Sequence, residues 1–206
     1  MIIQRNIYNL TLLIFFFGFN SAIAIAGEHI LIPKLGAVNW DDNNNHRANT
    51  DPFDFEDETV AGYGFKYLYK LNNGFAFGAE IFTYEKEIVT TANNNGDVLT
   101  THIYGVVEKI FNTEGNFKPF VGIGVGTSSM IFDANVNGEI DDGYNDFAAD
   151  LSYQLFTGAE VKLTDNIGLS FEYKYFDIDI SDDIDDRNIN IESDGHAVFV
   201  GVAIHI

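Results

Sequence analysis

The chain has 206 residues, no cysteine and three prolines, and 31 Asp and Glu residues against 11 Lys and Arg residues give it a net charge of −20. This length suits one domain or two small ones, and 46% hydrophobic and 15% aromatic residues are far too many for a disordered chain. The lack of cysteine excludes a disulfide scaffold, a cysteine-ligated zinc site and a lipid-anchored N-terminal cysteine. The acidic balance argues against nucleic acid as a partner.

Residues 1–26 are typical of a secretory signal peptide. Arg5 and the amino terminus supply the positive start, residues 10–19 form an apolar run, and Ala24 and Ala26 each end a small-x-small cleavage pattern. We leave cleavage after Ala24 or after Ala26 open. An uncleaved anchor is disfavoured because a spanning helix needs about 20 apolar residues. The mature domain, residues 27–206, then carries a net charge of −21 and contains no other apolar run of this length.

From Gly27 onward the dominant pattern is the alternation of apolar and other residues that is typical of β-strands. Val121, Ile123 and Val125, for example, alternate with glycines. The pattern predicts eight strands, at about 29–41, 58–71, 74–85, 98–111, 117–132, 148–163, 167–177 and 193–206.

The connections between these strands alternate strictly between short and long. Short turns fall at 72–73, 112–116 and 164–166, and long connections at 42–57, 86–97, 133–147 and 178–192. An up-and-down barrel with all its long loops at one end gives this pattern. The sequence therefore predicts an all-β fold, an eight-stranded antiparallel up-and-down transmembrane β-barrel with short periplasmic turns and long outer loops.

A soluble lipocalin-like barrel would be the alternative, and the position of the charges decides against it. Eight charged residues, four of each sign, alternate with large hydrophobic residues along the strands: Lys34, Lys66, Glu80, Glu108, Glu160, Lys162, Glu172 and Lys174. Near the middle of a bilayer, each would cost a few kcal/mol if it pointed at lipid. In a narrow lumen that side chains just fill, they can pair. We therefore predict that these eight residues form a charge network inside the barrel.

Aromatic residues gather near the ends of the predicted strands, as in the two interfacial girdles of membrane barrels. Those next to the short turns are Tyr67, Tyr69, Phe75, Phe111 and Phe117, and those next to the long connections are Trp40, Tyr84, Phe132 and Tyr175. The β-propensity of aromatic residues alone would account for some of these positions.

Two stretches and the C-terminus resemble a known family. FKPFVGIGVG, at 117–126, and GAEVKLTDNIGLSFEYKYFD, at 158–177, are similar to conserved strands of opacity-type and OmpA/OmpX-like eight-stranded outer-membrane β-barrels. The final strand, with Gly201, Val202, Ile204 and Ile206, is similar to the signal read by the barrel-assembly machinery, although it ends on isoleucine where the family usually has Phe. The resemblance implies an outer-membrane location and a role in adhesion, host-factor binding or resistance to host defences. Fold alone does not select among these roles.

The acidic residues gather in the long connections. Segments 41–58, 85–97, 133–150 and 177–194 hold 24 of the 31 acidic residues and three basic ones, while the rest of the mature chain is neutral. One interpretation is a solvated, self-repelling surface. The other is a surface that binds divalent cations, alone or as bridges to lipopolysaccharide phosphates. Phe53 and Phe55, in the first of these segments, either anchor a partner or fold back on the barrel rim.

One acidic segment also has the spacing of a calcium loop. Asp133, Asn135, Asn137, Glu139 and Asp141 occupy positions 1, 3, 5, 7 and 9 of an EF-hand-type pattern, with Gly138 at the sharp turn. Position 12 should be a bidentate Glu and is Tyr144, and these are also common turn residues. We therefore keep Ca²⁺ or another divalent cation as the one cofactor that the sequence suggests.

Catalysis finds little support in the sequence. The chain lacks the deacylase pattern, which is a histidine, one residue of any type and then Ser-Asn. It also has no nucleotide loop, haem motif or metalloprotease helix. His102 on one predicted strand could still lie next to Ser128 or Ser129 on the next, because neighbours in a barrel come from adjacent strands. We predict a monomeric, non-enzymatic outer-membrane protein that stabilises the envelope and displays acidic loops. A small-ion channel that opens when lumen Glu and Lys pairs rearrange is the alternative.

Overall fold

The computed structural model describes residues 27–41, 53–54, 59–90, 95–136, 139–140, 147–148, 151–184 and 187–206. The signal peptide predicted at residues 1–26 lies outside these ranges. Among the described residues, none forms a helix that is long and apolar enough to cross a membrane.

Eight long strands form the wall of the molecule. They are β1 (Glu28–Asp41), β3 (Thr59–Lys70), β4 (Phe75–Thr90), β5 (Asn95–Ile110), β6 (Phe117–Val136), β9 (Ser152–Lys162), β10 (Ile167–Ile184) and β11 (Arg187–His205). Three two-residue strands, β2 (Phe53–Asp54), β7 (Glu139–Ile140) and β8 (Phe147–Ala148), pair with β4 or β6 at the end where the long connections lie.

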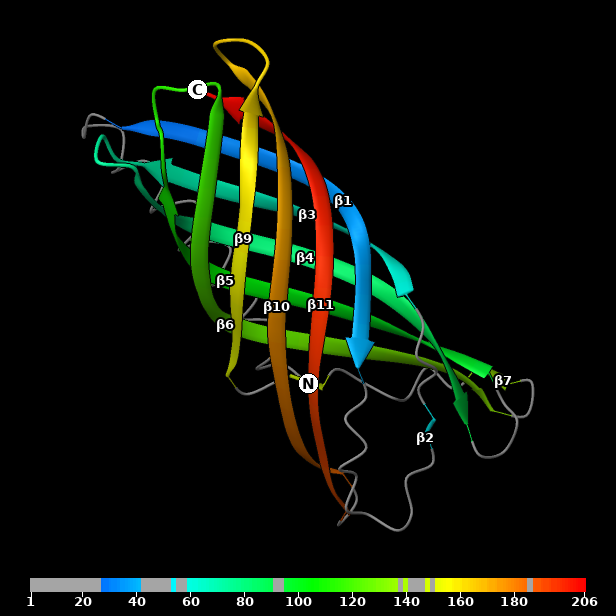
Figure 1. Ribbon diagram of the computed structural model, residues 1–206. Coiled ribbons are helices and arrows are strands. Elements are labelled where there is room, and N and C mark those ends of the chain that lie inside the picture. Colours follow the sequence, from blue (N-terminus) through cyan, green and yellow to red (C-terminus); the bar gives the residue numbers. More distant parts are fainter. Residues whose placement is uncertain are drawn as a thin grey trace.

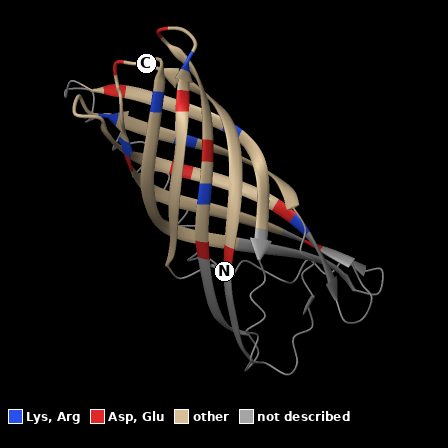
Figure 2. Cartoon of the chain, in the orientation of Figure 1, with Lys and Arg blue, Asp and Glu red and all other residues tan. Residues whose placement is uncertain are grey.

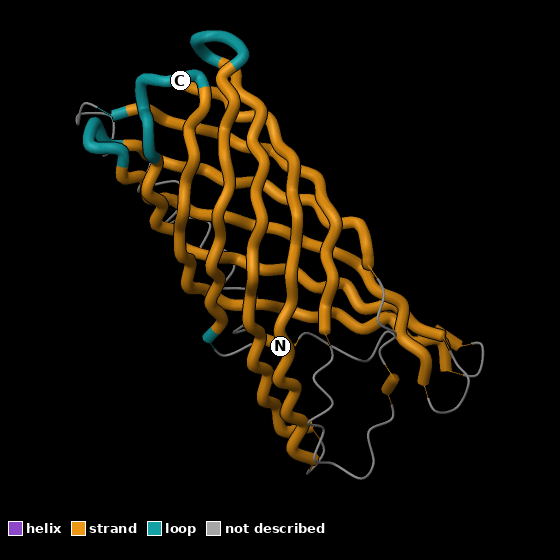
Figure 3. The backbone as a smooth tube through the Cα atoms, in the orientation of Figure 1, coloured by secondary structure: helices purple, strands orange, loops and turns teal. Residues whose placement is uncertain are grey.

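The wall is a closed barrel. Each long strand pairs antiparallel with its two neighbours, and the circle closes where β11 pairs with β1, from Ile30↔His205 to Asp41↔Asp194. The short turns lie together at one end, beside the C-terminus (Figures 1 and 3). The predicted eight-stranded up-and-down barrel is confirmed, and we call its two ends the turn end and the loop end.

Proline interrupts the seam at which the barrel closes. Pairing between β1 and β11 stops after Leu31↔Ile204 and resumes at Lys34↔Gly201, in the same register. The two bonds between His29 and Ile206 show that odd-numbered residues of β1 exchange hydrogen bonds with β11. Pro33 occupies such a position and has no N–H to donate, so a backbone hydrogen bond between β1 and β11 is missing there.

The two faces of the wall differ as a membrane barrel requires. On β6, Val121, Ile123 and Val125 point outward and are 47%, 55% and 52% exposed. Phe120, on the same strand, faces the lumen and is buried. Large apolar side chains therefore cover the outside, and charged side chains lie within. This arrangement rules out the soluble lipocalin-like alternative, whose apolar face would be inside.

Two of the predicted long loops are largely strand. β4 and β5 stay paired as far as Val89↔Asn95, across the predicted connection at 86–97. β10 and β11 stay paired as far as Ile184↔Arg187, across most of the predicted connection at 178–192. These boundaries were wrong because polar residues such as Asp179 and Asn190 signal turns in isolation, yet here they continue a hairpin that begins in the wall.

Candidate functional site

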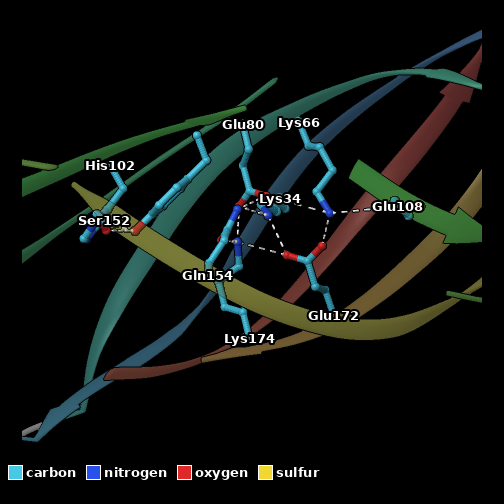
Figure 4. A network of polar contacts seen from close by, with 10 residues as sticks. Lys34, Lys66, Glu80, His102, Glu108, Ser152, Gln154, Glu172 and Lys174 are labelled. Atoms are coloured by element: carbon cyan, nitrogen blue, oxygen red, sulfur yellow. Dashed lines mark hydrogen bonds and ion pairs between the residues drawn. The ribbon is translucent and has the colours of Figure 1, made fainter. Parts of the chain in front are cut away.

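The centre of the lumen holds six charged side chains that five strands of the wall bring together. Lys34 comes from β1, Lys66 from β3, Glu80 from β4, Glu108 from β5, and Glu172 and Lys174 from β10. Each occupies an inward position of its strand, so strand alternation alone directs it to the barrel axis. All six side chains are at most 4% exposed (Figure 4).

Every lysine in this network contacts more than one carboxylate. Lys34 Nζ donates to Glu80 at 2.6 Å and to Glu172 at 2.7 Å. Lys66 donates to Glu172 and, at 3.4 Å, to Glu108. Lys174 donates to Glu80 and lies 3.2 Å from Glu172. The three lysines and three glutamates thus cancel in charge at the middle of the barrel.

Neutral side chains complete the packing of this network. Gln154 of β9 donates to Glu80 at 3.3 Å and accepts a hydrogen bond from Lys174 at 2.9 Å. Lys66 Nζ lies 4.0 Å from the centroid of the Phe156 ring, and Lys174 Nζ lies 4.5 Å from that of Phe82. Aromatic faces attract such cations, so these rings help to hold the ammonium groups in place while they exclude water.

A second ionic cluster lies toward the turn end. Glu160 of β9 accepts hydrogen bonds from Lys118 at 3.2 Å and from His205 Nε2 at 3.0 Å. The other ring nitrogen of His205 lies 2.5 Å from Glu28, whose second oxygen accepts a hydrogen bond from Lys70. These contacts link β6, β9, β11, β1 and β3 across the mouth of the barrel, so the predicted lumen residue Glu160 belongs to this cluster and not to the central network.

Lys162 does not join either set of lumen charges, which corrects the sequence prediction for this residue. It is the last residue of β9, its side chain is 30% exposed, and it donates to Asp165 in the adjacent turn at 2.9 Å. This ammonium group holds the pKa of the Asp165 carboxyl below its ordinary value. Lys162 would face the same side of β9 as Glu160, but it lies at the very end of the strand, where its side chain turns to Asp165 in the adjacent turn.

Polar and aromatic residues fill the lumen toward the loop end. His102 Nδ1 lies 2.6 Å from Ser128 Oγ on the neighbouring strand, and the hydroxyls of Tyr104 and Ser152 are 2.6 Å apart. The His102 ring stacks on Phe82 with centroids 4.3 Å apart. Tyr84, expected in an interfacial girdle, is fully buried in this layer because it shares the inward parity of Glu80 and Phe82.

Sequence analysis missed Gln154 in the central network and Lys118, Glu28 and Lys70 in the second cluster. Gln154 has the same parity along β9 as Glu160, which was a usable signal. Lys118 is the second residue of β6 and precedes a proline, so its strand position was ambiguous. It faces inward and is only 6% exposed.

The predicted calcium residues lie only partly in the described chain. Asp133 and Asn135 are on β6 and Glu139 is on β7, while Asn137 and Asp141 lie outside the described residues. The extended backbone of β6 through Val136 differs from the compact loop of an EF-hand. Where side chains are described, no group of three or more His, Asp and Glu residues is placed to hold a metal ion. Calcium binding stays a prediction.

The residues of the predicted assembly signal lie on the closing strand. Val202, Ile204 and Ile206 point outward and are 43%, 38% and 72% exposed, and Gly201 faces inward. A Cβ on Gly201 would come within 2.8 Å of the Pro33 carbonyl oxygen, on the opposite side of the seam. Glycine therefore allows β1 and β11 to approach closely beside the position where the backbone hydrogen bond is missing.

Comparison with known families agrees with this geometry. Residues 15–194 match the family described as "Outer membrane protein beta-barrel domain". The chain belongs to this family. The outer membrane is accordingly its location. Figure 2 shows that Lys, Arg, Asp and Glu residues are sparse along the described part of the wall. No curated protein sequence matches the chain significantly.

Solved structures with the same fold are distant in sequence. Neisserial surface protein A is 13% identical, with a TM-score of 0.58 over 86% of this chain and 96% of its own. Ail of Yersinia pestis, in complex with the heparin analogue sucrose octasulfate, is 13% identical, with a TM-score of 0.56 over 88% and 100%. OprG of Pseudomonas aeruginosa is 13% identical, with a TM-score of 0.59 over 88% and 96%. At this identity the likeness shows the fold alone.

Proposed function

We propose that this member of the outer-membrane barrel family stabilises the envelope and acts through its acidic outer segments, while its lumen is a structural plug. The observation that carries the proposal is the central network, in which Lys34, Lys66 and Lys174 pair with Glu80, Glu108 and Glu172. An eight-stranded barrel is only just wide enough for side chains to fill. Paired charges of equal number leave no net charge in the centre of the lumen to attract an ion.

The outer segments have the opposite character. Segments 41–58, 85–97, 133–150 and 177–194 carry all of the net charge of the mature chain, −21. In membrane barrels the long connections lie on the outside and the short turns in the periplasm. A surface with this charge favours cationic partners, or lipopolysaccharide phosphates bridged by divalent cations.

This preference differs from the ligand seen on a relative of the same fold. Ail was solved in complex with the heparin analogue sucrose octasulfate, which is a polyanion. The acidic segments of the present chain would repel such a molecule at low salt. We therefore propose surface attachment to cationic groups, with the chain as a monomer that the barrel-assembly machinery inserts through its last strand.

We propose that the chain is not an enzyme, although His102 and Ser128 lie within hydrogen-bond distance. A nucleophile must reach its substrate, yet these two residues are 0% and 1% exposed. On the other side of the ring, the Tyr84 hydroxyl lies 3.4 Å from His102 Nε2. The pair is better suited to ordering the packed layer at the loop end of the lumen.

Single-channel recording of the refolded mature protein in a planar bilayer tests the plug. We expect no conductance steps, with or without calcium, from protein that migrates as a heat-modifiable barrel on a gel. Reproducible steps that change on neutralising Lys174 would contradict the plug and place the function in the lumen.

A small-ion channel is the second candidate, and the contacts of Lys66 favour it. Its ammonium group contacts Glu172, lies 3.4 Å from Glu108, and is 3.8 Å from Glu80. A cation with three carboxylates in reach can exchange partners without losing all its pairs. Conductance steps in the native protein that change on neutralising Glu160 or Lys174 would support this gate.

A further inference from the structure

Six side chains gather on the outer face of the wall where β9, β10 and β11 approach the loop end. On β10 they alternate with the buried lumen residues Lys174 and Phe176, so they point outward. The Tyr173 hydroxyl lies 2.6 Å from His196 Nδ1, and the His196 ring lies 5.8 Å from the Tyr173 ring and 5.3 Å from the Tyr175 ring, centroid to centroid. We call the group the outer-face cluster: Tyr153, Tyr173, Tyr175, Asp177, Asp194 and His196.

Two carboxylates face each other within the outer-face cluster. Asp177 and Asp194 are directly opposite in the β10–β11 pairing, and Figure 2 shows acidic positions side by side where the described side chains of these two strands end. Tyr175 donates a hydrogen bond to Asp194 at 3.0 Å, and Tyr153, opposite Asp177 on β9, interacts with the Asp177 carboxylate. Like charges at directly opposed positions destabilise a strand pair. A cation held over the two carboxylates would relieve this repulsion.

The chemistry of the outer-face cluster suits an ammonium group. Among the outward positions of β9, β10 and β11 whose side chains the structure describes, none is a lysine or an arginine. The turn end of the wall differs, since Lys109 Nζ lies there 4.5 Å from the centroid of the outward Phe75 ring. Groups of aromatic rings bind quaternary ammonium ligands through their faces. The outer-face cluster combines such rings with two negative charges.

The side chains next to the cluster indicate that this ammonium group belongs to a lipid. Leu155, Phe171 and Val198 each lie two residues from a member of the cluster, on the side away from the loop end, and are 53%, 44% and 55% exposed. They belong to the apolar outer wall, which faces acyl chains in a membrane barrel. A lipid with its chains along these residues would bring its headgroup to the cluster, whereas a soluble partner would have to displace lipid to reach it.

We propose that the outer-face cluster binds the headgroup of a membrane lipid that ends in an ammonium group, such as phosphatidylcholine or phosphatidylethanolamine. The tyrosine rings hold the ammonium group by cation–π attraction, and Asp177 and Asp194 supply the opposite charge. The inference goes beyond the proposed function, because it assigns a lipid in the plane of the membrane to the outer face of the wall. It does not require the acidic segments as a whole to bind a partner.

Quenching of a single tryptophan by brominated lipids tests which lipid lies beside the cluster. One reporter carries Val198→Trp, opposite Tyr173, and the other carries Ile103→Trp on β5, four strands from β11 in either direction around the barrel. Both also carry Trp40→Phe, which removes the one native tryptophan. Each is reconstituted in equimolar phosphatidylcholine and phosphatidylglycerol, with bromine on the chains of one lipid at a time. The ratio of the two quenching levels gives the preference for the ammonium lipid.

We expect the preference for phosphatidylcholine to be about threefold larger at the Val198→Trp reporter than at the Ile103→Trp reporter. A cation–π contact at an exposed site supplies a factor of this size. The comparison is made at about 0.1 M salt, where attraction over more than about 10 Å is largely screened. The general field of the acidic segments therefore contributes little to the difference between the two reporters.

Two matched double variants of the Val198→Trp reporter locate the interaction. Asp177→Asn with Asp194→Asn neutralises the carboxylates of the cluster, and Glu85→Gln with Asp97→Asn neutralises two exposed carboxylates at the loop end of β4 and β5. Both change the net charge equally. The first should lower the preference to the value at the Ile103→Trp reporter, and the second should leave it unchanged. Heat-modifiable mobility checks that each variant is folded.

The outcomes separate the lipid site from the proposed acidic surface. Equal preferences at the two native-cluster reporters, or an excess that survives Asp177→Asn with Asp194→Asn, would overturn the lipid site. The acidic surface is tested by the Ile103→Trp reporter alone, whose preference should rise when the salt is lowered to about 0.01 M, since the Debye length then grows to about 30 Å. No rise there would count against the acidic surface and leave the lipid site standing.

Discussion

Lys34 on β1 donates a hydrogen bond to Glu172 on β10 at 2.7 Å, although 138 positions separate the two residues in the chain. The bond lies in the lumen and joins two strands that do not pair with each other, because β11 lies between them in the wall. It therefore connects two strands of the wall that no backbone pairing joins.

Glu172→Gln should destabilise the barrel by about 3–5 kcal/mol, because it leaves buried lysines with one carboxylate too few. Urea unfolding in detergent micelles, followed by the gel shift between folded and unfolded forms, measures the change. Adding Lys34→Met to this variant restores the balance of charge and should recover part of the loss.

Glu114→Gln is the matched control, since Glu114 lies in the exposed turn at 112–116. It should change stability by less than about 0.5 kcal/mol. Equal effects of Glu114→Gln and Glu172→Gln would show that the central network contributes nothing specific.

Gly122→Ala should cost about 1–3 kcal/mol through overpacking of the lumen. A Cβ at Gly122 would lie 2.2 Å from the Phe156 ring, and that ring packs under Lys66. Gly105→Ala is the control, because a Cβ there would meet nothing closer than 3.7 Å on the outer face. If the unfolding midpoints fall equally in both variants, glycine is required for the backbone of the wall and not for the space that it leaves in the lumen.

The orientation of the barrel can be tested cleanly because the chain has no cysteine. Asp183→Cys, near the tip of the β10–β11 hairpin, should react with an impermeant maleimide on intact cells. Asp165→Cys, in a turn where the Asp165 side chain is 97% exposed, should react only after lysis. The reverse result would invert the proposed topology.

Calcium should protect the outer segment around Asp133 from added protease if the predicted ligands act together. Replacing Asp133, Asn135 and Asn137 with alanine should abolish this protection, because it removes the oxygens at positions 1, 3 and 5. Fragment patterns with calcium and with chelator give the measurement. Protection that persists in the triple variant would remove the calcium prediction.

Much of the barrel could be predicted from residues alone, because strand alternation is a local property. Val121, Ile123 and Val125 had to share one face whatever their partners were. The same parity placed Glu80 and Lys174 on the other face, so the nature of the lumen could be foreseen. Tyr84 shares the parity of Glu80 and could have been assigned to the lumen on the same ground, had its position near a strand end not suggested a girdle.

Register and strand length could not be foreseen. Lys162 and Glu160 have the same parity, yet only Glu160 lies inside the mouth, because Lys162 is the last residue of its strand. The acidic hairpin beyond Asp177 looked like a loop, since its polar residues carry turn signals. Its strand character depends on the pairing of β10 with β11, which extends the hairpin beyond the wall.

The sequence by itself determined that this is a β-barrel with an apolar outside, a charged inside and acidic segments around its long connections, because side-chain alternation, composition and turn spacing are local properties of the chain. Only the tertiary structure decided that Lys34 meets Glu172, that Lys118 joins Glu160 and that β10 and β11 stay paired beyond the wall. Those facts depend on which strands lie opposite one another and in what register, and closure of the whole sheet fixes both.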